Sequence, residues 1–274
     1  MSRVLERLSV MAVLVALVAL SGPGCAAPEA PETSAAVSDR LEWFRHDKFG
    51  MFIHWGPYAA LGGEWNDRQV KVGENAEWIM QKLEIPVADY RERAREFNPV
   101  EFDPAQWVRL AKDAGMRYLV FTSKHHDGFA MYDSGVSDYN IVDWTPFGRD
   151  PLDELAQECR RQDLRFGFYY SHREDWNEPF AYGNTWDFDF DPEENLEAFE
   201  RKYLDTKAKP QLRELLTDYG EIALVWFDRG IYTQEQAKEF AQIVRGLQPH
   251  CLINGRIGVS FQREPRVVCQ FLVT

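Results

Sequence analysis

The sequence predicts an α/β fold of the (β/α)8, TIM-type barrel class, and three observations support this prediction. First, short apolar segments alternate with helical segments, as in a parallel sheet covered by helices. Second, polar residues follow the apolar segments, at the strand ends where such barrels place their chemistry. Third, Gly62-Gly63 does not match the G-x-G-x-x-G loop typical of a doubly wound open sheet, which is the alternative fold.

Length and composition restrict the classes of function. The chain has 274 residues, of which 45% are hydrophobic and 14% aromatic, and this is enough for a packed core. Its net charge is -13, with acidic and basic residues interleaved, so no nucleic-acid partner is expected because phosphate contacts need a basic surface. The four cysteines form no C-x-x-C pair, and an odd three lie outside the leader, so neither a zinc site nor a disulfide framework is predicted.

Residues 1–27 are predicted to be an export signal, because residues 8–20 are almost wholly apolar yet too short to span a bilayer comfortably. Cys25 resembles a lipoprotein attachment site, although Gly22-Pro23-Gly24 is a poor match to such sites. Lipidation at Cys25 and plain cleavage both stay open. Residues 28–38, rich in Ala, Pro, Glu and Ser, predict a disordered tether. We therefore expect an exported protein, either periplasmic, an outer-membrane lipoprotein, or secreted.

Five strands are predicted, because each apolar run is short and ends at a polar residue. The second is the clearest, since it is apolar and β-branched in its first half, as in a strand buried on both faces. It then runs directly into His125-His126. In chain order, the predicted strands cover 49–56, 116–124, 164–171, 222–228 and 251–256.

The helices between these strands are predicted from capping signals and from the spacing of apolar residues. Asp103 and Asp150 each precede a proline, which is typical of a helix N-terminus. Gly115 is expected to close the helix that follows Asp103. In chain order, a short amphipathic lead-in covers 41–48, and the predicted helices cover the second half of 75–97, 105–114, 151–162, about 192–219, and 234–247.

Asp228 is the first candidate for catalysis. It follows the apolar run Leu224-Val-Trp-Phe, so we expect a rigid backbone and a dry site there. A carboxylate fixed at such a point can attack an anomeric carbon and form a covalent intermediate. The alternative role is a helix N-cap, but the next predicted helix begins near Gln234, several residues too late.

Other side chains at the strand ends suit a sugar ligand. The histidines His54, His125 and His126 can donate to hydroxyl groups, bind a metal, or be hydrogen-bonded core residues. A metal-dependent hydrolase is less favoured, because the first strand offers His-Trp rather than His-x-His. Trp65 and Trp226 could stack on an apolar sugar face. Arg256 could hold a hydroxyl group or Asp228, or form a salt bridge at the barrel end.

Taken together, these segments resemble the α-L-fucosidases of glycoside hydrolase family 29. The most specific match is Lys124-His-His-Asp-Gly-Phe129, and the similarity runs in order from about Trp43 to about Gly258. The other matching segments are 43–44, 48–56, Gly63-Glu-Trp65, 145–150, Tyr169-Tyr-Ser171, Trp226-Phe-Asp228 and Asn254-Gly-Arg256.

The resemblance implies a catalytic (β/α) barrel followed by a C-terminal β-sandwich. It also implies an exo-acting, retaining hydrolysis of terminal α-L-fucose from fucosylated glycans, without a cofactor or a metal. Asp228 matches the nucleophile of the family. The positions that match the lining of the fucose pocket are His54, Glu64, Trp65, His125, His126, Tyr170, Trp226 and Arg256.

The acid/base carboxyl of a retaining mechanism is not assigned by the sequence. The family supplies it after the Asn-x-Arg strand, where this chain has only Glu264 and no matching segment. Five or six strand–helix units are predicted, the sixth only if 267–272 forms a strand, whereas a closed barrel needs eight. We therefore expect residues 39–274 to be the N-terminal part of the barrel, from a reading frame truncated or shifted after Gly258.

The alternative function is a non-catalytic, fucose-binding remnant. The sequence leaves open the activity of the 274-residue chain itself, its linkage and aglycone preference, and its oligomeric state.

Overall fold

A computed structural model describes residues 34–258 of the chain, and it contains a five-stranded sheet in the order β1-β4-β5-β6-β7. Every pair of neighbouring strands in this sheet is parallel. The strands are β1 (Met51–Ile53), β4 (Tyr118–Lys124), β5 (Arg165–Tyr170), β6 (Leu224–Phe227) and β7 (Leu252–Ile253). Each lies inside one of the predicted ranges, which confirms the parallel α/β fold, and the sheet corresponds to part of a (β/α) barrel.

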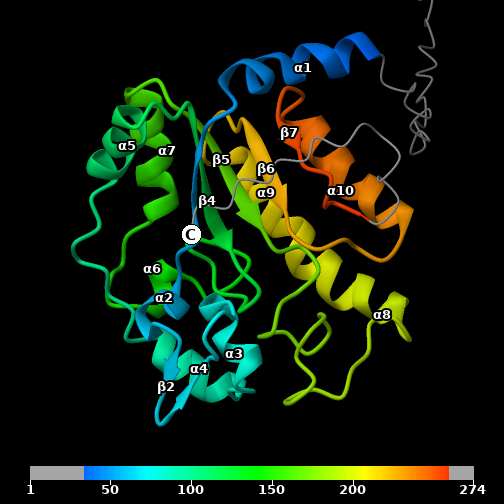
Figure 1. Cartoon of the computed structure of the whole chain (residues 1–274). Coiled ribbons are helices and arrows are strands. Elements are labelled where there is room, and N and C mark those ends of the chain that lie inside the picture. Colours follow the sequence, from blue (N-terminus) through cyan, green and yellow to red (C-terminus); the bar gives the residue numbers. More distant parts are fainter. Residues whose placement is uncertain (1–33, 259–274) are drawn as a thin grey trace, which may run out of the picture.

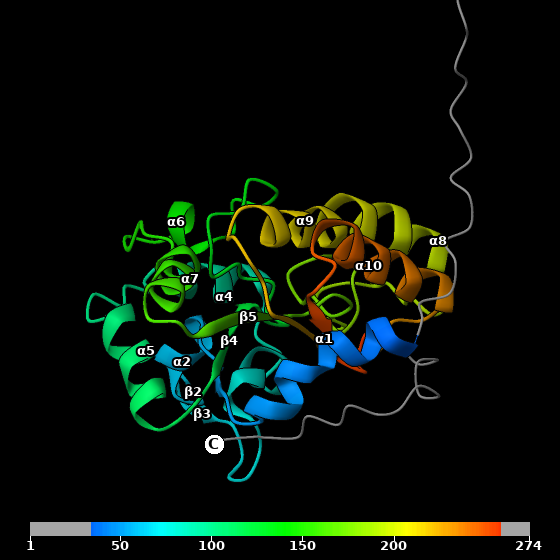
Figure 2. The same cartoon turned by 90° about the horizontal axis from the view of Figure 1, so that it is seen from above.

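Long helices cover the outer face of this sheet, as Figures 1 and 2 show. They are α5 (Pro104–Asp113), α7 (Pro151–Arg161), α9 (Lys209–Thr217) and α10 (Gln234–Leu247). The predicted caps are confirmed, because Asp103 accepts from the backbone N–H of Gln106 and Asp150 from that of Asp153, each at 3.0 Å. The helix predicted at about 192–219 consists of α8 (Leu196–Phe199), a π-helical segment (Glu200–Ala208) and α9.

Smaller elements gather beyond the carboxyl ends of the strands (Figure 1). They are α2 (Pro57–Leu61), the hairpin strands β2 (Glu64–Trp65) and β3 (Arg68–Gln69), a 3-10 helix (Ala76–Trp78), α3 (Ile79–Lys82), α4 (Val87–Ala94) and α6 (Ile141–Trp144). The helix expected in the second half of 75–97 is α4.

Helix α1 (Ser34–Asp47) lies across the amino ends of the strands, opposite the smaller elements (Figure 1). Its Trp43 and Phe44 rings each lie 5.7 Å from the ring of Tyr118 at the start of β4. Helix α1 overlaps the last residues, 34–38, of the predicted tether. The predicted export signal, the first part of the tether, the possible strand at 267–272 and Glu264 lie outside the described residues.

Side chains alternate along each strand, so the sheet separates two apolar clusters. The cluster under the outer helices includes Phe121, Phe168, Tyr170, Val225 and Phe227. The cluster on the inner face includes Phe52, Val120, Tyr169, Leu224 and Trp226. This alternation decides which strand residues can reach a site inside the barrel.

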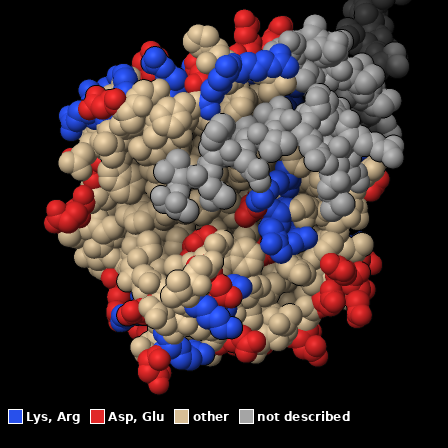
Figure 3. Space-filling view, viewed as in Figure 1, with Lys and Arg blue, Asp and Glu red and all other residues tan. Residues whose placement is uncertain are grey.

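The face of the molecule seen in Figure 3 has acidic and basic side chains dispersed around its rim, and a further small group of basic side chains with an acidic neighbour lies just right of its centre. That face offers no continuous basic surface of the kind that nucleic-acid phosphates need. Among the helices of the described part of the chain, none is both long enough and apolar enough to cross a membrane.

Candidate active site

Titratable and aromatic side chains from several strand ends meet in one cluster on the inner face. His54 follows β1, His125 and His126 follow β4, and Tyr169 lies near the end of β5. The His125 and Tyr169 rings are stacked, with centroids 5.3 Å apart, and the His54 ring lies 5.4 Å from that of His125. Asp228, directly after β6, completes this cluster, because parallel strands bring their carboxyl ends to one edge of the sheet.

Both carboxylate oxygens of Asp228 have partners. Its Oδ2 accepts from the Tyr169 hydroxyl at 3.0 Å and lies 3.4 Å from Nε2 of His126. Its Oδ1 accepts from Arg256 at 2.5 Å and from the backbone N–H of Arg229 at 2.9 Å. Burial alone would raise the pKa of Asp228, but His126 and Arg256 outweigh it and hold this pKa well below its usual range. The carboxylate is therefore ionised at neutral pH and fixed in orientation.

Polar atoms around Asp228 are buried but unpaired within the described part of the protein. They are Nδ1 of His125, Nε2 of His126 and Oε2 of Glu174. Burial lowers the pKa of His125 well below its usual range, so this ring is neutral and offers one donor and one acceptor. Because buried polar groups normally have partners, unpaired ones beside an ionised carboxylate are suited to a ligand with several hydroxyl groups.

Trp226 and Arg256 lie at the same cluster, as the sequence led us to expect. The half-buried Trp226 ring is 5.2 Å from Phe52, and Phe52 is 4.8 Å from His54, so an aromatic wall runs beside the histidines. The Arg256 side chain is 58% exposed and reaches Asp228 from the open side. The structure thus brings together six of the nine predicted site residues, namely His54, His125, His126, Trp226, Asp228 and Arg256.

Tyr170 lies on the wrong face of the sheet to line this site. Its hydroxyl donates toward the carbonyl of Ala208 and the side chain of Gln211, both under the outer helices. Its neighbour Tyr169 points inward, and its register partner across the ladder is Trp226. The prediction for Tyr170 is therefore wrong, and Tyr169 is the site residue that the sequence argument missed.

A matched pair of variants tests this correction. Tyr169→Phe removes a hydrogen bond to an ionised carboxylate, so we expect kcat/KM for an α-L-fucoside, the substrate that the family resemblance implies, to fall by about tenfold or more. Tyr170→Phe should leave kcat/KM within about twofold and instead lower the free energy of unfolding by about 1 kcal/mol. Steady-state kinetics and denaturant unfolding of both variants check this, and equal kinetic losses would contradict the assignment.

Glu64 and Trp65 lie in the β2–β3 hairpin rather than at the strand ends. The exposed Glu64 accepts from Gln69 at 3.3 Å, and Trp65 packs against a separate apolar cluster that contains Tyr58 and Trp176. That cluster borders the histidines, since the Tyr58 ring lies 5.3 Å from His125. No contact within residues 34–258 joins Glu64 or Trp65 to Asp228, so their place in a sugar pocket stays a prediction.

Glu174 is the second carboxylate near this site, and sequence reasoning did not identify it. Its Oε2 lies 3.8 Å from Nδ1 of His126, on the opposite side of the ring from Asp228. Its Oε1 is paired with Arg229 at 2.9 Å and with Arg173 at 3.1 Å. Because Oε1 is already held by two guanidinium groups and Oε2 faces His126 rather than the open side of the site, we do not assign Glu174 as the acid that protonates a leaving group.

The described residues do not favour a metal centre. Among residues 34–258, no group of three or more His, Cys, Asp or Glu side chains converges in a way that would hold a metal ion. The metal-dependent hydrolase considered from the sequence therefore gains no support.

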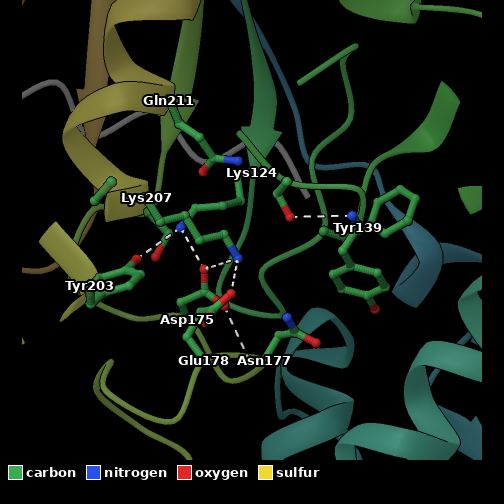
Figure 4. Close-up of polar contacts among 12 residues, drawn as sticks. Lys124, Tyr139, Asp175, Asn177, Glu178, Tyr203, Lys207 and Gln211 are labelled. Carbon is green, nitrogen blue, oxygen red and sulfur yellow. Dashed lines mark hydrogen bonds and ion pairs between the residues drawn. The ribbon is translucent and has the colours of Figure 1, made fainter. Parts of the chain in front are cut away.

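A buried ionic network lies behind the site, between the sheet and the outer helices (Figure 4). Asp175 accepts from Lys124 at 3.0 Å and is paired with Lys207 at 3.0 Å. Lys207 also donates to Glu178 at 2.8 Å. The side chains of Lys124 and Asp175 are completely buried. The network ties the end of β4, which carries the two histidines, to the loop after β5.

Two backbone features strengthen this connection. The N–H of Trp176 donates to the carbonyl of His126 at 2.7 Å. Gly128 has φ +75°, and a Cβ there would lie 2.1 Å from Oδ1 of Asp175. The residues of Lys124-His-His-Asp-Gly therefore have separate tasks, because the lysine and the glycine fit Asp175 while the histidines face the site.

Comparison with known proteins gives consistent matches. Residues 26–270 match the family described as Alpha-L-fucosidase. Tissue alpha-L-fucosidase of Rattus norvegicus is 32% identical over 191 residues, and plasma alpha-L-fucosidase of Homo sapiens is 33% identical over 193 residues. Each alignment covers 68% of this chain but only 39% and 38% of those two proteins, so the chain spans about two fifths of their length.

Solved structures match both in fold and in sequence. The α-L-fucosidase AlfC from Lactobacillus casei, in complex with its α-L-fucose product, has a TM-score of 0.74 at 43% identity. That similarity covers 81% of this chain and 72% of the other. The α-L-fucosidase from Vibrio sp. strain EJY3 has a TM-score of 0.73 at 42% identity, covering 81% of this chain and 39% of its own.

Proposed function

The chain belongs to the α-L-fucosidase family, and from that premise we propose that it is an exo-acting glycosidase that removes terminal α-L-fucose with retention of configuration. The observation that carries the proposal is the ionised Asp228 carboxylate, held by Tyr169, His126 and Arg256 at the carboxyl ends of the strands. A carboxylate fixed in this way is ready to act as a nucleophile at an anomeric carbon.

The proposed reaction has two steps. In the first, an Asp228 oxygen bonds to the anomeric carbon while the bond to the leaving-group oxygen breaks and its electron pair departs with that oxygen. In the second, water bonds to the same carbon and releases one proton to solvent, and the electron pair of the sugar–Asp228 bond returns to the carboxylate. Two inversions give net retention. The residue that protonates the leaving group is not assigned within residues 34–258.

The proposed sugar pocket combines apolar and polar surfaces. The ring of Trp226 beside Phe52 suits the apolar face and methyl group of a 6-deoxy sugar. The unpaired Nδ1 of His125 suits one of its hydroxyl groups. AlfC or variants of it form complexes with α-L-fucose, with 4-nitrophenyl-α-L-fucopyranoside and with Fuca(1,6)GlcNAc. We propose fucosylated glycans as the substrates of this chain as well.

We further propose that the protein is exported by the leader at residues 1–27, because the leader has a short apolar run followed by small residues. Mass spectrometry of the mature N-terminus distinguishes the two routes. An acylated Cys25 supports an anchored lipoprotein, and a free terminus near Ala26 or Ala27 supports plain cleavage. Retention of the leader would contradict both.

Donors with activated leaving groups test the proposed hydrolysis most clearly. Fluoride departs without being protonated, so α-L-fucosyl fluoride does not depend on the unassigned acid. We expect the purified chain to release fluoride, and ¹H NMR to show α-L-fucose as the first-formed product. First-formed β-L-fucose would contradict retention, and no fluoride release would contradict the hydrolysis.

A second candidate is fucose binding without hydrolysis. It is favoured by the position of Glu174, the second carboxylate near the site. Glu174 lies across the His126 ring from Asp228 and is paired with two arginines, so it is not assigned as the acid that hydrolysis needs. A rise in Tm with L-fucose but without fluoride release would select this candidate. Fluoride release would remove it.

A further inference from the structure

Ser171 follows β5 and makes two short hydrogen-bonding contacts in the interior of the protein. The residue is fully buried. Its Oγ donates to the backbone carbonyl of Glu174 at 2.7 Å and lies 2.7 Å from Nδ1 of His126. Neither contact involves Asp228 or the proposed sugar pocket directly.

The single proton of the hydroxyl group decides which atom is the donor in the contact between Ser171 and His126. A serine hydroxyl has one proton, and a carbonyl oxygen can only accept, so the proton of Ser171 is used by Glu174. The Ser171 oxygen must then accept at its other contact. Nδ1 of His126 is therefore the donor, and it carries a proton.

The opposite edge of the His126 ring faces a second acceptor. Its Nε2 lies 3.4 Å from Oδ2 of Asp228 and has no other partner among the described residues. A neutral ring with its proton on Nδ1 would direct the Nε2 lone pair at a carboxylate, which is unfavourable. A ring that is protonated on both nitrogens satisfies both contacts.

Acidic side chains predominate around the ring. The titratable groups that face it are Asp228, Glu174, Asp127, His125 and His54. Glu174 lies 3.8 Å from Nδ1, and Asp228 faces Nε2, so a carboxylate stands at each edge of the ring. The arginines of this region pair with those carboxylates: Arg173 and Arg229 with Glu174, and Arg256 with Asp228.

We propose that Ser171 is a positioning residue of the proposed fucoside hydrolysis, which keeps a proton on Nδ1 of His126 so that the ring faces Asp228 as an imidazolium. The inference rests on the proposed function. When the sugar leaves Asp228 in the second step, the bond between the anomeric carbon and the Asp228 oxygen breaks, and its electron pair returns to the carboxylate. Water supplies the new bond and releases one proton to solvent. The imidazolium stabilises the carboxylate that re-forms, and it transfers no proton.

Nitrogen NMR of histidine-labelled protein tests the protonation directly, with His126→Gln used to assign the signals. At pH 7 we expect both ring nitrogens of His126 to carry protons in the parent chain. In Ser171→Ala, Nδ1 loses its acceptor, so we expect the proton to remain on Nε2 alone. Ser171→Thr retains a hydroxyl and should restore the parent signals. An unprotonated Nε2 in the parent chain, or identical spectra for Ser171→Ala, would overturn the inference.

Kinetics with 4-nitrophenyl α-L-fucoside give the second readout, since loss of the sugar from Asp228 limits kcat when the leaving group is good. Ser171→Ala should lower kcat by about tenfold and lower KM in parallel, which leaves kcat/KM within about threefold of the parent. A loss confined to kcat/KM, or no kinetic change, would contradict a role in the second step.

Ser123→Ala is the matched control. Ser123 is also fully buried, and its hydroxyl also donates to a backbone carbonyl, that of Tyr169, at 2.7 Å. It should cost a similar amount of stability while leaving the His126 signals and kcat/KM unchanged. If the parent chain releases no fluoride, the proposed function fails, whereas unchanged His126 signals in Ser171→Ala with normal turnover refute this inference alone.

Discussion

Replacing Asp228 with glycine is expected to lower kcat/KM for α-L-fucosyl fluoride by roughly 10³-fold or more. The carboxylate is the only group within the described cluster that is both ionised and fixed by Tyr169, His126 and Arg256. Without it, the anomeric carbon has no nucleophile at bonding distance. Fluoride release measured at saturating and low donor concentrations gives the loss.

The glycine variant also leaves room for an external nucleophile. Added azide should restore activity and give β-L-fucosyl azide, because azide would attack from the side where Asp228 normally bonds. The control is Asp163→Gly, in the turn before β5 at the opposite end of the sheet. Its φ of +55° suits glycine, so activity and stability should be kept. Full activity in Asp228→Gly would contradict the assignment of the nucleophile.

Replacing Asp175 with asparagine is expected to lower the free energy of unfolding by about 3–5 kcal/mol at pH 7. The change keeps the shape of the side chain but leaves Lys124 and Lys207 without the carboxylate that both contact at 3.0 Å. A buried cation without a partner costs much more than a surface pair contributes. Urea unfolding of the two proteins measures the difference, and a loss below about 1 kcal/mol would contradict the role of the network.

The pH dependence of this loss follows from the lysines. Burial lowers the pKa of Lys124 to about 8 even with Asp175 beside it, and removal of the carboxylate should lower it further. An unfolded lysine has a pKa of about 10.4. Between these two values the unfolded state binds more protons, so the free energy of unfolding of Asp175→Asn should rise as the pH is raised. The deficit at pH 9 should therefore be smaller than at pH 7.

A surface ion pair supplies the matched control for Asp175. Asp205 contacts Lys209 at 2.7 Å, but its side chain is 48% exposed. Asp205→Asn should change the free energy of unfolding by less than about 1 kcal/mol, because water screens the pair. Equal losses in the free energy of unfolding for the two variants would mean that burial is not the reason why the network around Lys124 stabilises the protein.

The sequence predicted the strands and the polar residues at their ends, because both depend on local patterns. A run such as Leu224 to Phe227 followed by Asp228 is readable without knowledge of the rest of the chain. The helix starts at Asp103 and Asp150 were equally local, since capping is decided within four residues.

Which of Tyr169 and Tyr170 faces the site cannot be predicted from the local sequence. Both are aromatic residues of one strand, and a shift of one position exchanges the inner and outer faces. Only the register between β5 and β6, which pairs Tyr169 with Trp226, fixes the face. The contact of Lys124 with Asp175, 51 residues further on, was hidden for the same reason. The role of Glu174 depends on a loop whose course no sequence period encodes.

The central claim is that Asp228 forms the covalent bond to the sugar, and trapping that bond tests it most directly. In 2-deoxy-2-fluoro-α-L-fucosyl fluoride, the fluorine at C2 slows both steps, while the fluoride leaving group allows the first to proceed. After incubation and proteolysis, mass spectrometry should find one added deoxyfluoro-fucosyl group on the peptide that contains Asp228, with fragmentation placing it on that residue. An adduct on Glu174, on any other residue, or no adduct while α-L-fucosyl fluoride is turned over would contradict the account.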